Sequence, residues 1–376
     1  IEIHGDRLVG SLCSTVLNHR EDQYGGSLEN RTRYALEVLQ AIKEAAPGMM
    51  VEYKLPIITV NPDGSLRGKG GLLVDEAVEF AKMLDAAGID MIQVAQANHT
   101  GNMGDTIPPM GAVPYNWTLD ACEKVKAVVS CPVATVGRVV SVEAGLKILE
   151  DGSADIIGYG RSLLTDPDIA NKVEKGECIR ECLNCNKGCV DAIQGRRYLS
   201  CVLNAENGDE ETIFLKPAVE VKKVAVVGGG LAGLEAARVA AKRGHTVTLF
   251  EKTDRLGGQI NIACVPPRKD EILRSVKYYE NVLPTMVDIK MNHEPSFDEL
   301  NAFDHVILAI GAHNMDLPMP VVNSNVVSSW DVLNGLDVTG KVVVLGGGLV
   351  GAETAEYLAN KGLDVTIVEM MDKIAA

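Results

Sequence analysis

The chain has 376 residues, of which 46% are hydrophobic, so it can fill more than one core and its length indicates two or three domains. Its 51 acidic and 36 basic residues give a formal net charge of −15, which argues against nucleic acid or an anionic membrane as a partner. The sequence shows neither a signal peptide nor a run of about 18 apolar residues. Because it opens on Ile1 and stops soon after beginning a second strand–helix–strand unit, we expect a fragment of a longer protein.

Residues 1–176 alternate short apolar runs with amphipathic stretches, which predicts strands and helices in regular succession. Helices are expected over Leu28–Ala45 and Asp75–Ala87, the first with Ser27 as its N-cap and Glu29 in its first turn. The succession implies parallel strands, and a doubly wound sheet and a barrel both fit it. Since no phosphate-binding glycine fingerprint is present, we favour an α/β fold that is the C-terminal part of a (β/α)8 barrel lacking its first three strands. The expected strands are Ile1–Ile3, Met50–Leu55, Met91–Ala95, Val133–Val136 and Ile156–Tyr159.

Charged residues follow several of these strands, where the active site of a barrel forms. Gly137-Arg138 and Gly160-Arg161 follow the last two strands. A glycine lets a phosphate approach and a guanidinium binds it with two hydrogen bonds, which predicts a phosphate site of the FMN type. Lys54 ends an earlier strand and would place positive charge beside a reduced flavin. Ordinary surface arginines and a solvated lysine are the alternatives.

Two histidines occupy comparable positions. His4 ends the first expected strand, and His99 lies in the loop after the third. Both are candidates to donate a hydrogen bond to a substrate carbonyl, although a lone histidine is more often structural.

Five of the nine cysteines fall within residues 178–201, and four of them follow the pattern Cys182-x2-Cys185-x3-Cys189-x11-Cys201. This clustering favours metal binding in a reducing compartment, and hence the cytoplasm, over a secreted disulfide framework. Four thiolates on one short segment can hold an iron–sulfur cluster. Zinc and buried thiols are the alternatives, but zinc would more often show two Cys-x2-Cys pairs or histidine ligands. Cys178 falls outside the spacing, and we do not expect it to be a ligand.

Two glycine-rich turns that nearly repeat one another follow the cysteines. Each lies between a valine-rich strand and a helix, and an acidic residue that can bind a ribose follows the next strand. At the first turn the helix is expected over Leu234–Lys242 and the next strand over Thr246–Phe250. A second glycine pair after the first turn suits a flavin, so we expect FAD there. At the second turn the carboxylate disfavours a 2′-phosphate, so we expect NADH rather than NADPH. The residues are Gly228, Gly230, Gly233, Glu251, Gly258 and Gln259 at the first turn, and Gly346, Gly348, Gly351 and Glu369 at the second.

These patterns predict four segments. They are a partial barrel over residues 1–176, an iron–sulfur segment over 177–220, the first part of an FAD-binding domain over 221–337, and the start of an NAD(P)-binding domain over 338–376.

The segment Asn18–Arg31, which reads NHREDQYGGSLENR, closely resembles the signature of the old yellow enzyme family of FMN barrels. With the cysteine spacing and the two glycine turns, the chain resembles the multidomain branch of 2,4-dienoyl-CoA reductase and clostridial enoate reductase. The resemblance implies FMN, a [4Fe–4S] cluster, FAD and a pyridine nucleotide working in series. Hydride enters at FAD, single electrons cross the cluster, and FMN reduces the activated C=C bond of a 2-enoate or a 2,4-dienoyl thioester.

Carried over by position, the resemblance implies that Lys54 lies near the flavin pyrimidine and that His4 holds the substrate carbonyl. Arg7 stands where relatives have a second carbonyl donor, and Val9 stands where they have a proton-donating tyrosine. The proton donor is therefore not identified, and we hypothesise that Arg7 binds a substrate carboxylate. The remaining carried-over residues are Gly137, Arg138, Gly160 and Arg161 for the FMN phosphate and Cys182, Cys185, Cys189 and Cys201 for the cluster.

Three other functions fit parts of the pattern. An amine dehydrogenase of the same architecture would run oxidatively, and a glutamate-synthase-like electron-input subunit would share the cysteines and glycine turns but lack the barrel. A degenerate chain kept as a binding partner would fit the missing tyrosine. The expected partner is a small-molecule enoate or enoyl thioester, with no nucleic acid and no membrane, and the sequence leaves a homo-oligomer open.

Overall fold

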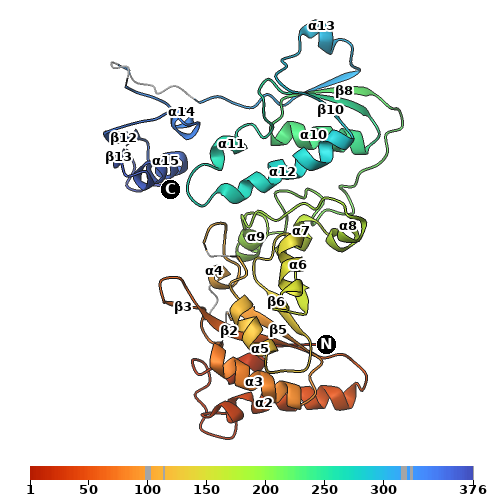
Figure 1. The fold of residues 1–376 in the computed structure, drawn as a ribbon, viewed down its shortest axis with the longest axis vertical. Coiled ribbons are helices and arrows are strands. Elements are labelled where there is room, and N and C mark those ends of the chain that lie inside the picture. The colour runs from red at the N-terminus through yellow and green to blue at the C-terminus, as the bar shows by residue number, and fades with distance from the viewer. Residues whose placement is uncertain (98–102, 113–114, 315–319, 322–324, 376) are drawn as a thin grey trace. The chain divides into compact units, whose positions relative to one another are not determined.

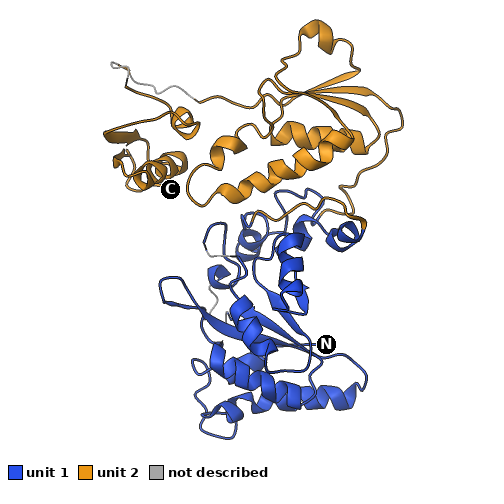
Figure 2. Cartoon of the chain, in the orientation of Figure 1, with its two compact units in different colours: residues 1–174, 184–208 blue, residues 175–183, 209–376 orange. Residues whose placement is uncertain are grey.

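The computed structural model describes residues 1–97, 103–112, 115–314, 320–321 and 325–375. It divides the chain into two compact units, shown in Figure 2. Unit 1 comprises Ile1–Glu174 and Asn184–Gly208, and unit 2 comprises Lys175–Leu183 and Asp209–Ala376. One of the boundaries between the units therefore falls inside the cysteine-rich segment, between Leu183 and Asn184.

Unit 1 is built on parallel strands in the order β1-β2-β5-β6-β7. Apart from the short strands β3 and β4, which pair with β2, each strand lies beside the previous one in the chain. All crossovers therefore run in one direction, as a barrel requires, and the predicted C-terminal part of a barrel is confirmed. The strands are β1 (Glu2–His4), β2 (Glu52–Val60), β3 (Leu66–Arg67), β4 (Leu72–Leu73), β5 (Met91–Gln96), β6 (Val133–Val136) and β7 (Ile156–Gly158).

Helices follow the strands of unit 1 and cover one face of the sheet. Figure 1 shows α2 and α3 side by side, and their apolar residues pack on alternate residues of β1, β2 and β5. Tyr53 of β2 meets Phe80 of α3 edge to face at 5.2 Å. The helices are α1 (Leu8–Cys13), α2 (Leu28–Ala45), α3 (Val74–Ala86), α4 (Met103–Thr106), α5 (Leu119–Lys126), α6 (Val142–Glu150), α7 (Arg161–Thr165), α8 (Ile169–Lys175) and α9 (Val190–Gln194).

Strand β2 is longer than the sequence predicts, and this moves Lys54. The strand continues through Pro56 to Val60, so Lys54 is its third residue and not its last. The Lys54 carbonyl accepts from Gly5 N at 3.1 Å on the β1 side, whereas the Ile57 carbonyl accepts from Ala97 N at 2.8 Å on the β5 side. Pro56 therefore faces the β1 side, beyond the end of β1, and its missing N–H breaks no ladder bond.

Unit 2 contains a parallel sheet of order β10-β9-β8-β11. Strand β8 lies between β9 and β11, so the order reverses at β8, as in dinucleotide-binding folds. Helices α10 and α12 lie next to each other on this sheet (Figure 1). The elements are β8 (Lys223–Val227), α10 (Leu231–Lys242), β9 (Thr246–Phe250), α11 (Ile260–Ala263), α12 (Leu273–Val282), β10 (Asp288–Lys290), α13 (Phe297–Leu300), β11 (His305–Leu308) and α14 (Ser329–Leu333).

The last segment of unit 2 begins a second nucleotide-binding unit. It consists of β12 (Lys341–Leu345), α15 (Leu349–Asn360) and β13 (Asp364–Val368), with the two strands parallel. This confirms the predicted Rossmann-like character of the C-terminal part. Within the described residues, none of the helices is both long enough and apolar enough to span a bilayer.

Candidate functional site

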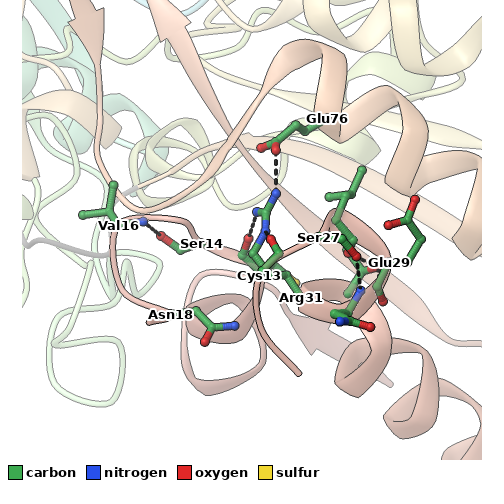
Figure 3. A network of polar contacts seen from close by, with 12 residues as sticks. Cys13, Ser14, Val16, Asn18, Ser27, Glu29, Arg31 and Glu76 are labelled. Atoms are coloured by element: carbon green, nitrogen blue, oxygen red, sulfur yellow. Dashed lines mark hydrogen bonds and ion pairs between the residues drawn. The ribbon is translucent and has the colours of Figure 1, made fainter. Parts of the chain in front are cut away.

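Buried polar residues of the segment Asn18–Arg31 hold the chain in place (Figure 3). Arg31 is 4% exposed, and its guanidinium donates to the carbonyls of Gly26 and Cys13 and to the Glu76 carboxylate of α3. Asn18 Nδ2 donates to the carbonyls of Leu12 and Tyr24. The segment therefore fixes the path of the chain from α1 to α2.

Two turn features explain the small and polar residues of the same segment. A Cβ on Gly25 would lie 1.9 Å from the Arg20 carbonyl oxygen, so only glycine fits there. Ser27 caps α2, because its side chain accepts from Asn30 N, as the sequence predicts.

The end of β1 brings two of the predicted site residues together. His4 is the direct neighbour of Lys54 in the parallel register, and Lys54 is in turn the neighbour of Gln93. Burial, followed by the charge of Lys54, lowers the pKa of His4 below its ordinary value of 6.5. His4 is therefore neutral at pH 7 and has one ring N–H to donate. His99 lies outside the described residues.

Arg7 and Val9 follow at the start of α1. The Arg7 side chain is 69% exposed, with Nη1 at 3.8 Å from Asp6 Oδ2. The same Nη1 donates to the Asp6 carbonyl at 3.0 Å. Val9 is partly buried and packs against the core of unit 1. Arg7 can thus reach a ligand, whereas Val9 supplies packing and no proton.

The loop after β6 has the shape of an anion cradle. Gly137 has φ +154°, and a Cβ there would lie 2.9 Å from Thr118 Oγ1. Arg138 adopts a left-handed φ of +53° and is buried, with its guanidinium 4.5 Å from the centre of the Tyr115 ring. The backbone and the stacked guanidinium fit the phosphate of FMN.

The loop after β7 reaches the cysteine-rich segment. Gly160 is the N-cap of α7, and the space beside its Cα is open. Arg161 Nη1 donates to Asn186 Oδ1 at 2.6 Å and to the Pro108 carbonyl at 3.0 Å. Both Gly-Arg pairs thus follow neighbouring strands, and Arg161 also contacts the residue after Cys185.

The cysteines are divided between the units. Cys182 belongs to unit 2, where its carbonyl accepts from Arg274 Nη1 at 2.7 Å. Burial raises the pKa of the Cys185 thiol, and Cys189 and Cys201 raise it further. Cys185, Cys189 and Cys201 all belong to unit 1. These three cysteines supply soft sulfur donors of the kind that hold an iron–sulfur cluster.

Two further observations concern this segment. No three histidine, cysteine, aspartate or glutamate side chains within the described ranges converge as they would around a single metal ion. Cys178, in the same segment, is exposed.

Two other cysteines, Cys13 and Cys122, belong to the core of unit 1. Burial raises the pKa of the Cys13 thiol to about 11.

At the first glycine turn, backbone segments come so close together that a side chain would not fit between them. A Cβ on Gly233 would lie 1.9 Å from the Gly228 carbonyl oxygen, and one on Gly228 would lie 2.3 Å from the Ala309 carbonyl oxygen. Gly230 is the N-cap of α10, so the helix begins at Leu231, three residues earlier than the sequence predicts. The glycines therefore let strand, turn and helix pack closely around a bound pyrophosphate.

Glu251 ties this turn to the end of β9. It is 7% exposed and accepts from Gly229 N at 2.7 Å and from Thr253 N and Oγ1, both at 2.8 Å. Burial alone would raise its pKa, but these hydrogen bonds outweigh burial and lower the pKa. A buried, ionised carboxylate at this position fits a ribose partner.

The second glycine pair lies against the first turn. Gly257 N donates to the Gly229 carbonyl at 2.8 Å, and a Cβ on Gly258 would lie 3.1 Å from Gly230 Cα. Gln259 Nε2 donates to the Ala312 carbonyl at 3.2 Å. The loop after β11, which contains Ala312, was missed by the sequence reasoning, because its contact with the first turn depends on strand order.

The second glycine turn repeats the backbone contacts that the first turn makes with its carboxylate. A Cβ on Gly351 would lie 1.8 Å from the Gly346 carbonyl oxygen, and Gly348 caps α15. Glu369 accepts from Gly347 N at 2.6 Å and from Met371 N at 2.9 Å. The hydrogen bonds from Met371 and Gly347 lower the pKa of Glu369. The turn fits a second dinucleotide.

The sequence reasoning also missed Gln96, at the end of β5. Its buried Oε1 accepts from Thr59 Oγ1 at 2.6 Å and Trp117 Nε1 at 3.1 Å. Its Nε2 donates to the carbonyls of Ile57 and Arg67. Both polar atoms of the Gln96 side chain are thus hydrogen-bonded, and they hold the ends of β2 and β5 together. No local sequence pattern distinguishes this residue from an exposed glutamine.

Two family models match the chain. Residues 1–178 match the NADH:flavin oxidoreductase / NADH oxidase family. Residues 202–266 and 222–376 match the pyridine nucleotide-disulphide oxidoreductases. The two matches correspond to the barrel part and to the nucleotide-binding part.

The chain is similar to curated reductases. It is 54% identical to bilirubin reductase of Mediterraneibacter gnavus over 100% of this chain and 59% of that protein. It is 39% identical to cinnamate reductase of Clostridium sporogenes over 99% of this chain and 58% of that protein. The chain thus spans about three fifths of the length of these relatives.

Two solved structures have the same fold over the whole chain. A complex of 2-naphthoyl-CoA reductase with 2-naphthoyl-CoA matches with a TM-score of 0.88 and 28% identity, covering 100% of this chain and 57% of that one. Histamine dehydrogenase from Rhizobium sp. 4-9 matches with a TM-score of 0.82 and 27% identity, again covering 100% and 57%.

Proposed function

Because the chain belongs to the multidomain NADH:flavin oxidoreductases, we propose that the full-length protein is an NADH-dependent reductase of an activated C=C bond. The substrate class is a 2-enoate or a 2,4-dienoyl thioester, and a free carboxylate is favoured. Similarity to a bilirubin reductase and a cinnamate reductase supports this choice, since bilirubin and cinnamate are both conjugated and carry free carboxylates.

The cofactor sites of the proposal follow the geometry above. When bound, FAD accepts hydride from NADH, a [4Fe–4S] cluster transfers single electrons, and FMN delivers hydride to the substrate. In this proposal Lys54 carries positive charge beside the FMN pyrimidine and Glu369 binds the NADH ribose. The phosphate of FMN is assigned to Gly137, Arg138, Gly160 and Arg161, the cluster to Cys182, Cys185, Cys189 and Cys201, and FAD to Gly228, Gly230, Gly233, Glu251, Gly258 and Gln259.

The observation that carries the proposal is the pairing of a neutral histidine with an exposed arginine at the end of β1. In the neutral state that its lowered pKa favours, His4 can present only Nε2 to a substrate carbonyl, because its Nδ1 lies 3.1 Å from Glu2 Oε1. Arg7 lies three residues later with its guanidinium largely exposed and is held only by Asp6 among its described contacts. A guanidinium binds a carboxylate with two hydrogen bonds, so Arg7 selects free acids.

The proposal is tested with the full-length protein under anaerobic conditions. We expect iron and acid-labile sulfide to be present, the flavin absorbance to bleach on addition of NADH, and turnover of cinnamate and bilirubin to follow. Zinc in place of iron and sulfide would exclude the electron path, and bleaching without turnover of any enoate or enoyl thioester would exclude the substrate class.

Arg7→Ala tests the carboxylate contact. Because the guanidinium is largely exposed, we expect a loss of about 1 kcal/mol, or about a fivefold rise in KM for cinnamate. The methyl ester, which has no carboxylate charge, should show no change. Arg33→Ala removes an exposed arginine from α2 and serves as the control. An equal loss for acid and ester would refute the assignment of Arg7.

An amine dehydrogenase is the second candidate, favoured by the match to histamine dehydrogenase over the whole chain. It would take electrons from an amine and pass them outward, so its flavin would bleach on addition of the amine without NADH. Incubation with histamine and dimethylglycine in the absence of NADH separates the two functions.

A further inference from the structure

The turn that carries Cys185 is held by the two asparagines that flank it. Asn184 and Asn186 have left-handed φ values of +54° and +59°, and both are buried. Asparagine adopts this conformation at lower cost than most residues. The Asn184 carbonyl accepts from Met110 N at 2.8 Å, and Asn186 Nδ2 donates to the Ile107 carbonyl at 2.8 Å. The backbone before Cys185 and the side chain of the residue after it are therefore both tied to residues that follow β5.

Arg161 joins this turn to the end of the barrel. Its Nη1 donates to Asn186 Oδ1, so one asparagine side chain accepts from α7 and donates to Ile107. Arg161 is the first residue of α7 and follows Gly160, in the loop assigned to the flavin phosphate. A residue of the proposed phosphate site thus contacts the neighbour of a proposed cluster ligand.

The other end of α7 contacts a second cysteine. Thr165, the last residue of the helix, is 2% exposed, and its Oγ1 lies 3.5 Å from Cys201 Sγ. The same hydroxyl donates to the Arg161 carbonyl at 3.1 Å when Cys201 is a thiol, so its single proton must turn to the sulfur when Cys201 is a thiolate. Asn204 Nδ2 also donates to the Leu164 carbonyl of α7 at 3.0 Å. Since a thiolate has no proton, it can only accept a hydrogen bond from the Thr165 hydroxyl.

We propose that α7 has a second role besides binding the flavin phosphate: Arg161 positions the Cys185 turn through Asn186, and Thr165 donates a hydrogen bond to the Cys201 thiolate. The helix thereby controls both the assembly of the cluster and its reduction potential. The inference rests on the proposed function, because it requires the cluster. Residues that orient metal ligands typically affect metal affinity 10- to 100-fold, and hydrogen bonds to cluster sulfurs raise the potential.

The first experiment measures the cluster potential by EPR-monitored redox titration of the full-length protein. Thr165→Val should leave iron and FMN content unchanged and make the cluster potential more negative, because the thiolate loses its donor. Thr165→Ser keeps the hydroxyl and should restore the potential of the unchanged protein. A Thr165→Val potential equal to that of the unchanged protein would overturn the role of Thr165.

The second experiment measures iron and sulfide per FMN after dialysis against a chelator. Asn186→Ala should lose about 10-fold or more in iron retention, with FMN retained. Asn186→Asp keeps the acceptor for Arg161 but loses the donor to Ile107, so it should lose less. Arg161→Lys should also lower iron retention, because an ammonium lacks the guanidinium fork. Full iron retention in both Asn186→Ala and Arg161→Lys would overturn the positioning role.

The two proposals fail in different ways. If the unchanged full-length protein holds no iron and sulfide, the electron path fails and the inference falls with it. If the unchanged protein holds the cluster and these variants behave like it, the proposed function stands and only the inference is overturned.

Discussion

Arg31 is the residue whose replacement should expose the scaffolding role of the signature segment. It is buried, and its guanidinium holds the Gly26 and Cys13 carbonyls and the Glu76 carboxylate. Arg31→Ala would leave all three acceptors without this donor. The change lies in α2, away from the residues proposed to hold flavin or substrate, so it should affect stability first.

The size of the effect follows from the exposure of each partner. Each hydrogen bond from the charged guanidinium to a carbonyl contributes about 1.5 kcal/mol to the free energy of unfolding, which is the low end of the range for hydrogen bonds of charged groups. The ion pair contributes less than about 1 kcal/mol, because the Glu76 side chain is 32% exposed. Together they predict a loss of about 4 kcal/mol, which for a domain of this size corresponds to about 10 °C in Tm.

The assay is calorimetry of the full-length protein, following the transition in which FMN is released. The Tm of Arg31→Lys should lie between those of the unchanged protein and Arg31→Ala, because lysine keeps the charge but loses the planar guanidinium. Arg33→Ala, two residues later on the same helix and exposed, should shift Tm by less than about 2 °C. If Arg31→Ala shifts Tm no more than Arg33→Ala, the buried network does not stabilise the barrel.

Three further predictions concern the cofactor and substrate sites. Gly233→Ala should abolish FAD binding and leave FMN bound, as measured by flavin content, because its Cβ would lie 1.9 Å from the Gly228 carbonyl oxygen. Glu369→Ala should lower the NADH preference over NADPH in kcat/KM by about tenfold, and an unchanged ratio would refute the ribose contact. His4 is neutral above its ordinary pKa of 6.5 and charges only as pH falls below it, since burial and Lys54 lower its folded pKa. Any change in activity that follows the charge of His4 should therefore be confined to pH below 6.5, and a His4→Gln variant should lose it.

The features that the sequence predicted well are those that depend on neighbours a few residues apart. The close approach of Gly233 to Gly228 and the cap of α2 by Ser27 both act within a single turn, so spacing and residue type predict them. The elements β6 and β9 also begin and end as predicted, because runs of β-branched residues between turns leave little choice.

Two element boundaries, the end of β2 and the start of α10, differ from those predicted from the sequence. It ended the strand of Lys54 at the following proline, although Pro56 lies between the last residue of β2 that pairs with β1 and the first that pairs with β4. It began α10 three residues late, because it counted the glycine turn as outside the helix. In both cases the tertiary structure accommodates a residue that usually breaks an element: Pro56 lies beyond the end of β1, and the missing side chain of Gly233 lets α10 approach the Gly228 carbonyl.

By itself, the sequence determined the kind of chemistry that this protein can support: two dinucleotide turns, a set of soft sulfur donors and the charged ends of barrel strands. Only the tertiary structure decided which of these groups meet. His4 lies beside Lys54 through the strand register, Arg31 pairs with a carboxylate 45 residues away, and Arg161 reaches an asparagine 25 residues away beside Cys185. Such pairs depend on how separate strands and helices pack, and no pattern within a single turn or strand carries that information.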